Sequence, residues 1–136
     1  MTSTRFSLVT AMALGLAALL PCTAVRAQAG AACEPQSRHI DHLNACAVQR
    51  FQQADTAQNI LYADVMRALS AHERPALRKD QTAWSRQRTA GCKQRHAPDE
   101  SRAEWPRLYH DCLTQVTEQR RPALMHWLHE GRAPED

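Results

Sequence analysis

Large apolar side chains are scarce after Ala29, and this scarcity restricts what the chain can fold into. From residue 30 to residue 136, Leu, Ile, Val and Phe together occur only fourteen times. Such a thin core provides little hydrophobic stabilisation, and its composition alone is typical of disorder. The same region carries 15 Lys and Arg against 14 Asp and Glu, a net charge of +1, so the charge repulsion of most disordered chains is missing. We therefore expect a folded domain that needs covalent support.

Residues 1–29 have the pattern of a secretory signal peptide. Arg5 gives a positive start, an apolar run covers residues 6–20, and Ala27-Gln28-Ala29 has the small residues that signal peptidase requires. The apolar run is shorter than the roughly 20 residues that span a bilayer. We therefore expect no membrane span, cleavage after Ala27 or Ala29, and an exported periplasmic or secreted domain over residues 30–136.

The cysteines supply the covalent support that the thin core requires. Cys22 leaves with the signal peptide; the alternative, a lipoprotein modified at Cys22, is disfavoured because Pro21 precedes it. Four cysteines remain in the exported part, an even number that indicates two disulfides: Cys33, Cys46, Cys92 and Cys112. Three pairings of these four are possible.

The residues that favour helix dominate the exported part, and no alternating strand pattern is present. The first helix is expected from about residues 39–44 to 70, because apolar residues recur there at steps of three and four. The second is expected from Pro75 to about Gly91, followed by a loop over residues 93–100. A third should start near Ser101, Pro122 should kink or end it, and a short last helix is expected over residues 122–129. Ser70 with Glu73, and Ser101 with Glu104, have the spacing of capping boxes.

The fold class predicted from these elements is all-α, a small antiparallel bundle of three main helices plus a short C-terminal helix. Short connections favour antiparallel packing, which brings the end of the second helix beside the start of the third. Cys92 and Cys112 lie near those two ends, and Cys33 and Cys46 both lie near the start of the first helix. We therefore expect the disulfides Cys33–Cys46 and Cys92–Cys112, with the helical core over residues 33–128.

An ordered set of motifs resembles the LprI-like lysozyme-inhibitor family over residues 33–124. The motifs comprise Leu43-Asn44-Ala45-Cys46-Ala47, Phe51, Ala54-Asp55, Asn59, Tyr62, Leu77, Gln81, Trp84, Arg88, Cys92, Cys112-Leu113, Thr117, Arg120 and Leu124. The chain departs from the family pattern at Gln58, where leucine is usual, at Thr89, where an acidic residue is usual, and at Gln87, where an aromatic is frequent. The resemblance implies a helical domain of the cell envelope, with lysozyme inhibition inferred for some members.

Five polar residues at or beside the apolar stripes are interpreted as a hydrogen-bond network between helices, because buried polar groups must be paired. They are Asp55, Asn59, Arg88, Thr117 and Arg120. A binding surface is the alternative. Within the network, we expect Arg88 to pair with Asp55. We also expect Trp84 in the core, Trp105 exposed, and Trp127 over the bundle end.

The candidate partner-binding residues cluster around the predicted loop of residues 93–104. Asp99, Glu100 and Glu104 form an acidic patch suited to a basic protein, and Trp105 follows them. The alternative is an ordinary helix start, where carboxylates interact favourably with the helix dipole. A disulfide at the base of this loop would preorganise it for binding.

The sequence observations favour an exported binding protein, and the resemblance implies that it inhibits a lysozyme, for which we expect steric occlusion. No catalytic residues are predicted, because bridged cysteines cannot act as nucleophiles and no phosphate-binding loop or redox motif is present. We expect no cofactor and, from the low net charge, no nucleic-acid partner. A structural or stress-related envelope protein is one alternative. A small periplasmic metal-binding protein is another, but the pairs His39/His42 and His126/His129 offer only two ligands each, and no metal site is predicted.

Overall fold

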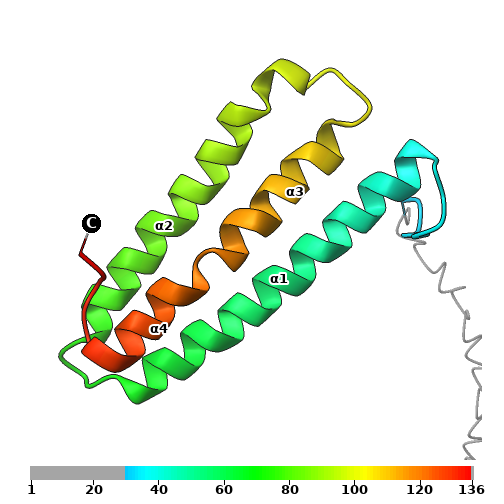
Figure 1. The fold of residues 1–136 in the computed structure, drawn as a ribbon. Helices are drawn as coiled ribbons and strands as arrows, with labels where there is room; N and C mark the ends of the chain where they lie inside the picture. Colours follow the sequence, from blue (N-terminus) through cyan, green and yellow to red (C-terminus); the bar gives the residue numbers. More distant parts are fainter. Residues whose placement is uncertain (1–29, 136) are drawn as a thin grey trace, which may run out of the picture.

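The computed structural model describes residues 30–135, so the predicted signal peptide and Cys22 lie outside the described residues. Over this range the chain is all-α, with no strand. The helices are α1 (Ile40–Ala68), α2 (Arg74–Arg95), α3 (Trp105–Glu118) and α4 (Arg121–Glu130), with a short 3-10 helix η1 (Ala97–Asp99) between α2 and α3 (Figure 1). The predicted fold class is confirmed.

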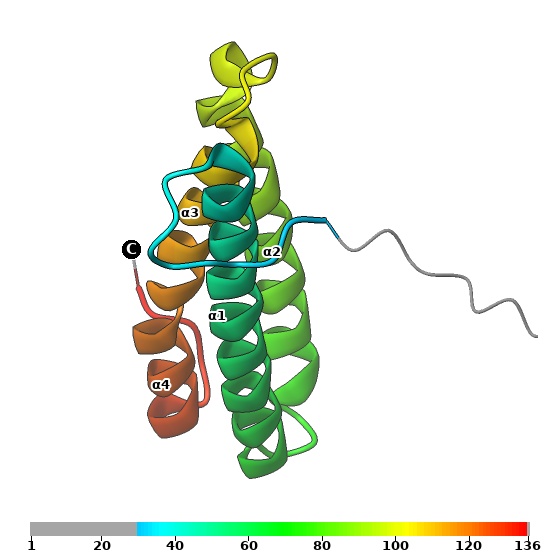
Figure 2. The ribbon, with the colours of Figure 1, turned by 90° about the vertical axis from the view of Figure 1, so that its right-hand side faces the viewer.

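Successive long helices run antiparallel, so α1 and α3 run in the same direction, and α4 continues α3 after a break (Figure 1). The helix α1 packs closely along α3 and α4, whereas α1 and α2 approach each other mainly through long side chains. In Figure 1, α3 lies between α2 and α1, and Figure 2 shows α1 in front of the other helices, so the three long helices form a triangle. None of the helices within residues 30–135 is both long enough and apolar enough to cross a bilayer.

The turn between α1 and α2 contains half of the predicted capping box. The Ser70 backbone N–H donates to Glu73 Oε2 at 2.8 Å, but the Ser70 side chain caps nothing, and Glu73 is itself the residue before α2. Hydrogen bonds from Ser70 lower the pKa of the Glu73 carboxyl. The charged Glu73 therefore stabilises the turn at neutral pH, and this contribution is lost as the pH falls through the lowered pKa.

The end of α2 was predicted four residues too early. Gly91 does not stop the helix, which continues through Arg95, so the connection to α3 is residues 96–104. An interior glycine costs helix stability of only about 1 kcal/mol. Continuation is favoured because it carries Cys92 to its disulfide partner and because Lys93 and Arg95 suit the negative end of the helix dipole.

The start of α3 was also predicted too early, at Ser101 instead of Trp105, and the expected Ser101–Glu104 capping box is absent. Residues 100–104 form turns instead. Pro122 does begin the last helix, as its second residue, and α4 ends where Gly131 takes a left-handed backbone with φ 66°. This left-handed backbone favours glycine at position 131, because a side chain there would be strained; a Cβ would also displace the carboxylate at the flexible end of Glu73.

The core consists of two small apolar clusters at opposite ends of the bundle. One is formed where α4 meets the α1–α2 turn, by Val65, Leu69, Leu77, Leu124 and Trp127. The other surrounds the Cys92–Cys112 disulfide and includes Leu113, with Phe51, Tyr109 and Val116 against it. Trp127 is buried in the first cluster, in agreement with its predicted place. The middle of the bundle lies between these clusters and is filled mainly by polar and aromatic side chains.

Both predicted disulfides are confirmed. Cys33–Cys46 ties the N-terminal segment to the start of α1, and Cys92–Cys112 joins the last turns of α2 to α3, with Cα atoms 5.7 Å apart. The second disulfide is almost completely buried, whereas Cys33 is partly exposed. Only the second one therefore contributes directly to helix packing.

We predict that the double variant Cys92→Ser/Cys112→Ser loses about 3 kcal/mol of unfolding free energy, because the unfolded chain regains the freedom of a 20-residue loop. Urea titration followed by circular dichroism measures this loss. An unchanged unfolding midpoint would show that the apolar cluster holds α2 on α3 without the disulfide.

Candidate functional site

The guanidinium of Arg88 connects all three long helices. From α2, its Nη1 donates to Asp55 Oδ1 on α1 at 2.7 Å and to Thr117 Oγ1 on α3 at 2.8 Å. The Thr117 hydroxyl donates in turn to the Leu113 carbonyl, and Asn59 donates to the second oxygen of Asp55 at 3.1 Å. The structure thus brings four of the five predicted network residues together. Because the partners of Arg88 come from different helices, the network sets the relative register of the helices.

The fifth predicted residue, Arg120, belongs to a neighbouring group that the sequence analysis did not identify. Its Nη2 donates to Asp80 Oδ2 at 2.6 Å, and its Nε donates to Gln81 Oε1 at 3.3 Å. Asp80 also accepts a hydrogen bond from the indole N–H of Trp127 at 2.7 Å. This group joins α2 to the break between α3 and α4. The signal for Asp80 was present, since it is the one carboxylate of α2.

Trp84 links the two groups. It is half-buried, and its ring lies beneath the guanidinium of Arg88, 4.8 Å from the ring centroid, and that of Arg120, at 5.3 Å. The Phe51 ring also contacts the Arg88 guanidinium, at 5.3 Å. Cation–π contacts of this kind are worth about 0.5–2 kcal/mol each, depending on how well the cation is desolvated. Trp84 was expected in an apolar core and instead forms part of this layer of charged groups and aromatic rings.

The connection between α2 and α3, residues 96–104, carries the acidic patch, and Arg102 and His96 compensate only part of its charge. Arg102 lies 3.0 Å from Asp99 and 3.4 Å from Glu104, and His96 lies 3.6 Å from Asp99. The pKa of the Glu104 carboxyl is lowered mainly by a hydrogen bond from the Glu104 backbone N–H and secondly by the positive charge of Arg102. Glu100 is exposed and forms no ion pair within residues 30–135. Arg102 was not among the residues predicted from the sequence to belong to this patch.

Asn44 on α1 holds the base of this connection. Its Nδ2 donates to the Ala103 carbonyl at 2.9 Å, and its Oδ1 accepts from the Arg107 backbone N–H at 3.1 Å. Arg107 is the third residue of α3, the position whose N–H an N-terminal cap normally satisfies. Asn44 therefore caps α3 from a different helix, which explains why Ser101 is not needed for that purpose.

Trp105 is not the exposed residue that was expected. It is partly buried, and its ring stacks on that of Tyr109 with centroids 5.1 Å apart and planes 3° from parallel. Its indole nitrogen is covered and has no hydrogen-bond partner within the described chain. Only part of Trp105 is therefore available to a binding partner.

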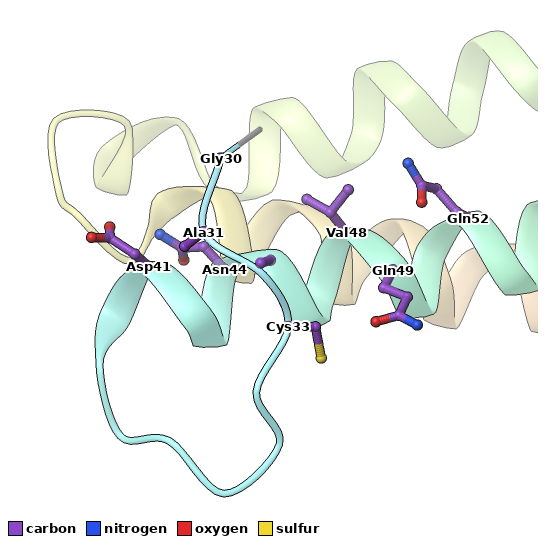
Figure 3. Close-up of a pocket in the computed structure, with 9 residues that line it drawn as sticks. Gly30, Ala31, Cys33, Asp41, Asn44, Val48, Gln49 and Gln52 are labelled. Carbon is purple, nitrogen blue, oxygen red and sulfur yellow. The ribbon is translucent and has the colours of Figure 1, made fainter. Parts of the chain in front are cut away.

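Several hollows lie along α1, and two of them bear on a possible binding site. The larger, of about 690 Å³, lies between α1 and the N-terminal segment and is open to solvent; Figure 3 shows Asp41, Asn44, Gln49 and Gln52 along it. Asn44 is already engaged as the cap of α3. This shallow hollow therefore offers no concentrated group of functional side chains.

The smaller hollow, of about 230 Å³, lies between α1 and the α3–α4 break and is more enclosed. Gln58 lines it and is 6% exposed, yet neither its amide oxygen nor its amide nitrogen has a partner in residues 30–135. The resemblance described in the sequence analysis led to the expectation of leucine at this position. An unpaired buried amide reduces stability, so glutamine here has a structural cost.

A metal site finds no support in the described part of the chain. No three of its His, Cys, Asp and Glu residues come close enough together to hold an ion. His42 Nδ1 lies 2.7 Å from the Ala32 carbonyl oxygen, so this ring nitrogen is already hydrogen-bonded to the backbone.

We predict that Arg88→Ala lowers the free energy of unfolding by about 2–3 kcal/mol, because it leaves Asp55 and Thr117 without their partner. Chemical denaturation measures the loss. Arg86→Ala, at an exposed and unpaired position two residues away, is the matched control and should stay within about 0.5 kcal/mol of the wild type. Equal effects of the two variants would contradict a structural role for Arg88.

We predict that Gln58→Leu raises the free energy of unfolding by about 1–3 kcal/mol, because it replaces an unpaired buried amide with an apolar side chain of similar size. Gln53→Leu, on the exposed side of α1, serves as the control and should have little effect. A destabilised Gln58→Leu protein would show that the amide has partners in solution.

Comparison with known proteins assigns the chain to a family. No curated protein and no solved structure matches it. The family profile described as "Lysozyme inhibitor LprI" matches residues 33–124, which include both disulfides, Asn44, the Arg88 network and the 96–104 connection. The chain therefore belongs to the LprI lysozyme-inhibitor family.

Proposed function

We propose that the protein is exported and inhibits a lysozyme by inserting the 96–104 connection into the glycan-binding cleft of the enzyme. The observation that carries this proposal is a projecting segment with a rigid base. Figure 2 shows the connection and the adjoining helix ends extending beyond the start of α1. A lysozyme cleft is concave, so a narrow projection of this kind is the complementary shape.

Preorganisation supports the same assignment. The Cys92–Cys112 disulfide and the two hydrogen bonds of Asn44 hold the base of the connection, and Arg102 braces it between Asp99 and Glu104. A segment that is already ordered loses less conformational entropy on binding. The proposed inhibition is steric, so it requires neither a catalytic residue nor a cofactor.

Charge determines which end of the molecule faces the enzyme. Many lysozymes are basic, and the connection carries three carboxylates against one arginine, with Glu100 exposed and uncompensated. The helix α2, by contrast, carries seven Lys and Arg and one Asp. A basic enzyme is therefore repelled by the outer face of α2 and attracted to the connection, although the +1 charge of residues 30–136 provides little long-range steering.

We predict that the purified, oxidised protein slows cell-wall clearing by at least one of several lysozymes at micromolar concentration. Glu100→Gln/Glu104→Gln should weaken this inhibition several-fold, because it removes two carboxylates from the projecting end. Glu34→Gln/Glu130→Gln removes the same charge from exposed positions on other elements and should leave inhibition unchanged.

Absence of inhibition at micromolar excess over every lysozyme tested would reject the proposal. It would favour the alternative of a structural or stress-related envelope protein. Equal weakening by both double variants would indicate that net charge, not the 96–104 connection, governs the interaction.

A further inference from the structure

We infer that the outer face of α2 is a docking surface for an anionic phospholipid bilayer. The inference rests on the proposed export of the protein and is independent of lysozyme inhibition. The face is defined by four exposed cations, Arg78, Lys79, Arg86 and Lys93, and is called the α2 basic face below.

Positive charge is concentrated on α2 far beyond its share of the chain. This helix is only 22 residues long, yet it carries seven of the 15 Lys and Arg found from residue 30 to residue 136. It carries only one of the 14 Asp and Glu of the same region. That one, Asp80, is occupied by Arg120 and Trp127. The overall charge of +1 therefore conceals a strongly basic helix.

The four cations share one side of α2. At 3.6 residues per turn they fall within an arc of about 100° on the helix, turned away from the inward side that carries Leu77 and Arg88. From Arg78 to Lys93 the row is about 22 Å long at 1.5 Å per residue. Nothing else in the described bundle covers this side, because α2 forms one edge of it (Figure 1).

None of the four cations forms an ion pair with any residue from 30 to 135. The arrangement also has a cost for the isolated protein. Arg74 and Arg78 are like charges four residues apart, a spacing that destabilises a helix. Arg74, the first residue of α2, also stands at the positive end of the helix dipole. An external anion would relieve this repulsion, whereas solvent alone only screens it.

A groove beside the α2 basic face has the chemistry expected for a phosphate group. It has a volume of about 530 Å³ and is lined by Arg78 and Arg86 together with the hydroxyl-bearing Tyr62 and Ser85. Thr82 also lines it, but the Thr82 hydroxyl already donates to the Arg78 carbonyl at 2.8 Å. No carboxylate lines it. Guanidinium and hydroxyl donors are the groups that proteins use to bind phosphate oxygens.

The bilayer is favoured over a nucleic acid by what the α2 basic face lacks. No aromatic side chain lies among its four cations, so it offers no platform on which successive bases can stack. Four cations along a straight edge suit a flat layer of anionic headgroups, where each Lys or Arg near the surface contributes separately. The absence of large apolar residues among them predicts adsorption without insertion.

Vesicle co-sedimentation tests the inference. The oxidised protein should bind vesicles of phosphatidylcholine mixed with phosphatidylglycerol in a two-to-one ratio at low ionic strength. Added salt should release it, and it should not bind pure phosphatidylcholine. Arg78→Gln/Lys79→Gln/Arg86→Gln/Lys93→Gln should weaken binding by roughly tenfold or more. Circular dichroism verifies that each variant remains folded, which is expected because all four side chains are exposed and unpaired.

The matched control is Arg38→Gln/Arg67→Gln/Arg121→Gln/Arg132→Gln, which removes the same four charges from exposed positions outside α2. It should retain binding within about twofold of the wild type. Equal loss in both quadruple variants, or no binding by the wild type, would overturn the inference. Tighter binding to duplex DNA or to inorganic polyphosphate than to the mixed vesicles, at equal phosphate and salt, would overturn the choice of a bilayer. Because no lysozyme is present, the result stands apart from the inhibition assay.

Discussion

The packing of the bundle depends on one guanidinium, that of Arg88. Arg88 belongs to α2, and its guanidinium is hydrogen-bonded to Asp55 on α1 and to Thr117 on α3. The apolar clusters lie on either side of this layer and are too small to set the helix positions by shape alone. Paired charges inside a protein often add little net stability compared with apolar residues of similar volume, but they penalise every arrangement that separates them. The polar layer therefore contributes specificity of register, while the disulfides restrict the unfolded chain.

The same internal pairing separates the molecule into regions with different charge. Near the Cys92–Cys112 disulfide, the 96–104 connection is acidic and braced, whereas along α2 the cations are exposed and unpaired. The inward-facing carboxylates explain the contrast, because Asp55 pairs with Arg88 and Asp80 pairs with Arg120 inside the bundle. With Asp80 turned inward, the outer side of α2 keeps only positive charge. The internal network and the external charge pattern thus have a common origin in how the few carboxylates are used.

Local sequence patterns predicted the elements well and their ends poorly. The recurring apolar stripe and the scarcity of glycine were sufficient to predict three helices. Helix direction predicted the Cys92–Cys112 disulfide, and the position of Cys33 and Cys46 near the start of the first helix predicted the other. The predicted end of α2 and the predicted start of α3 were wrong because tertiary contacts determine them. The Cys92–Cys112 disulfide outweighs the helix-breaking tendency of Gly91, and Asn44 replaces Ser101 as the cap of α3. No local pattern reveals a cap supplied by another helix. The pairing of Arg88 with Asp55 was foreseen from their positions on facing stripes, whereas Arg102 went unnoticed because the connection was expected to be a loop with free carboxylates.

The two proposed surfaces also constrain each other geometrically. A bilayer that holds the α2 basic face lies parallel to the helix, so the 96–104 connection, which follows α2 directly, would be held at the level of the headgroups and would not point away from them. A basic lysozyme is attracted to the same anionic surface. Enzyme and connection would then meet within a thin layer, where confinement raises their effective concentration. If both proposals hold, this arrangement would compensate for the weak long-range steering expected from a net charge of +1, because the shared surface, not the field of the protein, would bring the partners together.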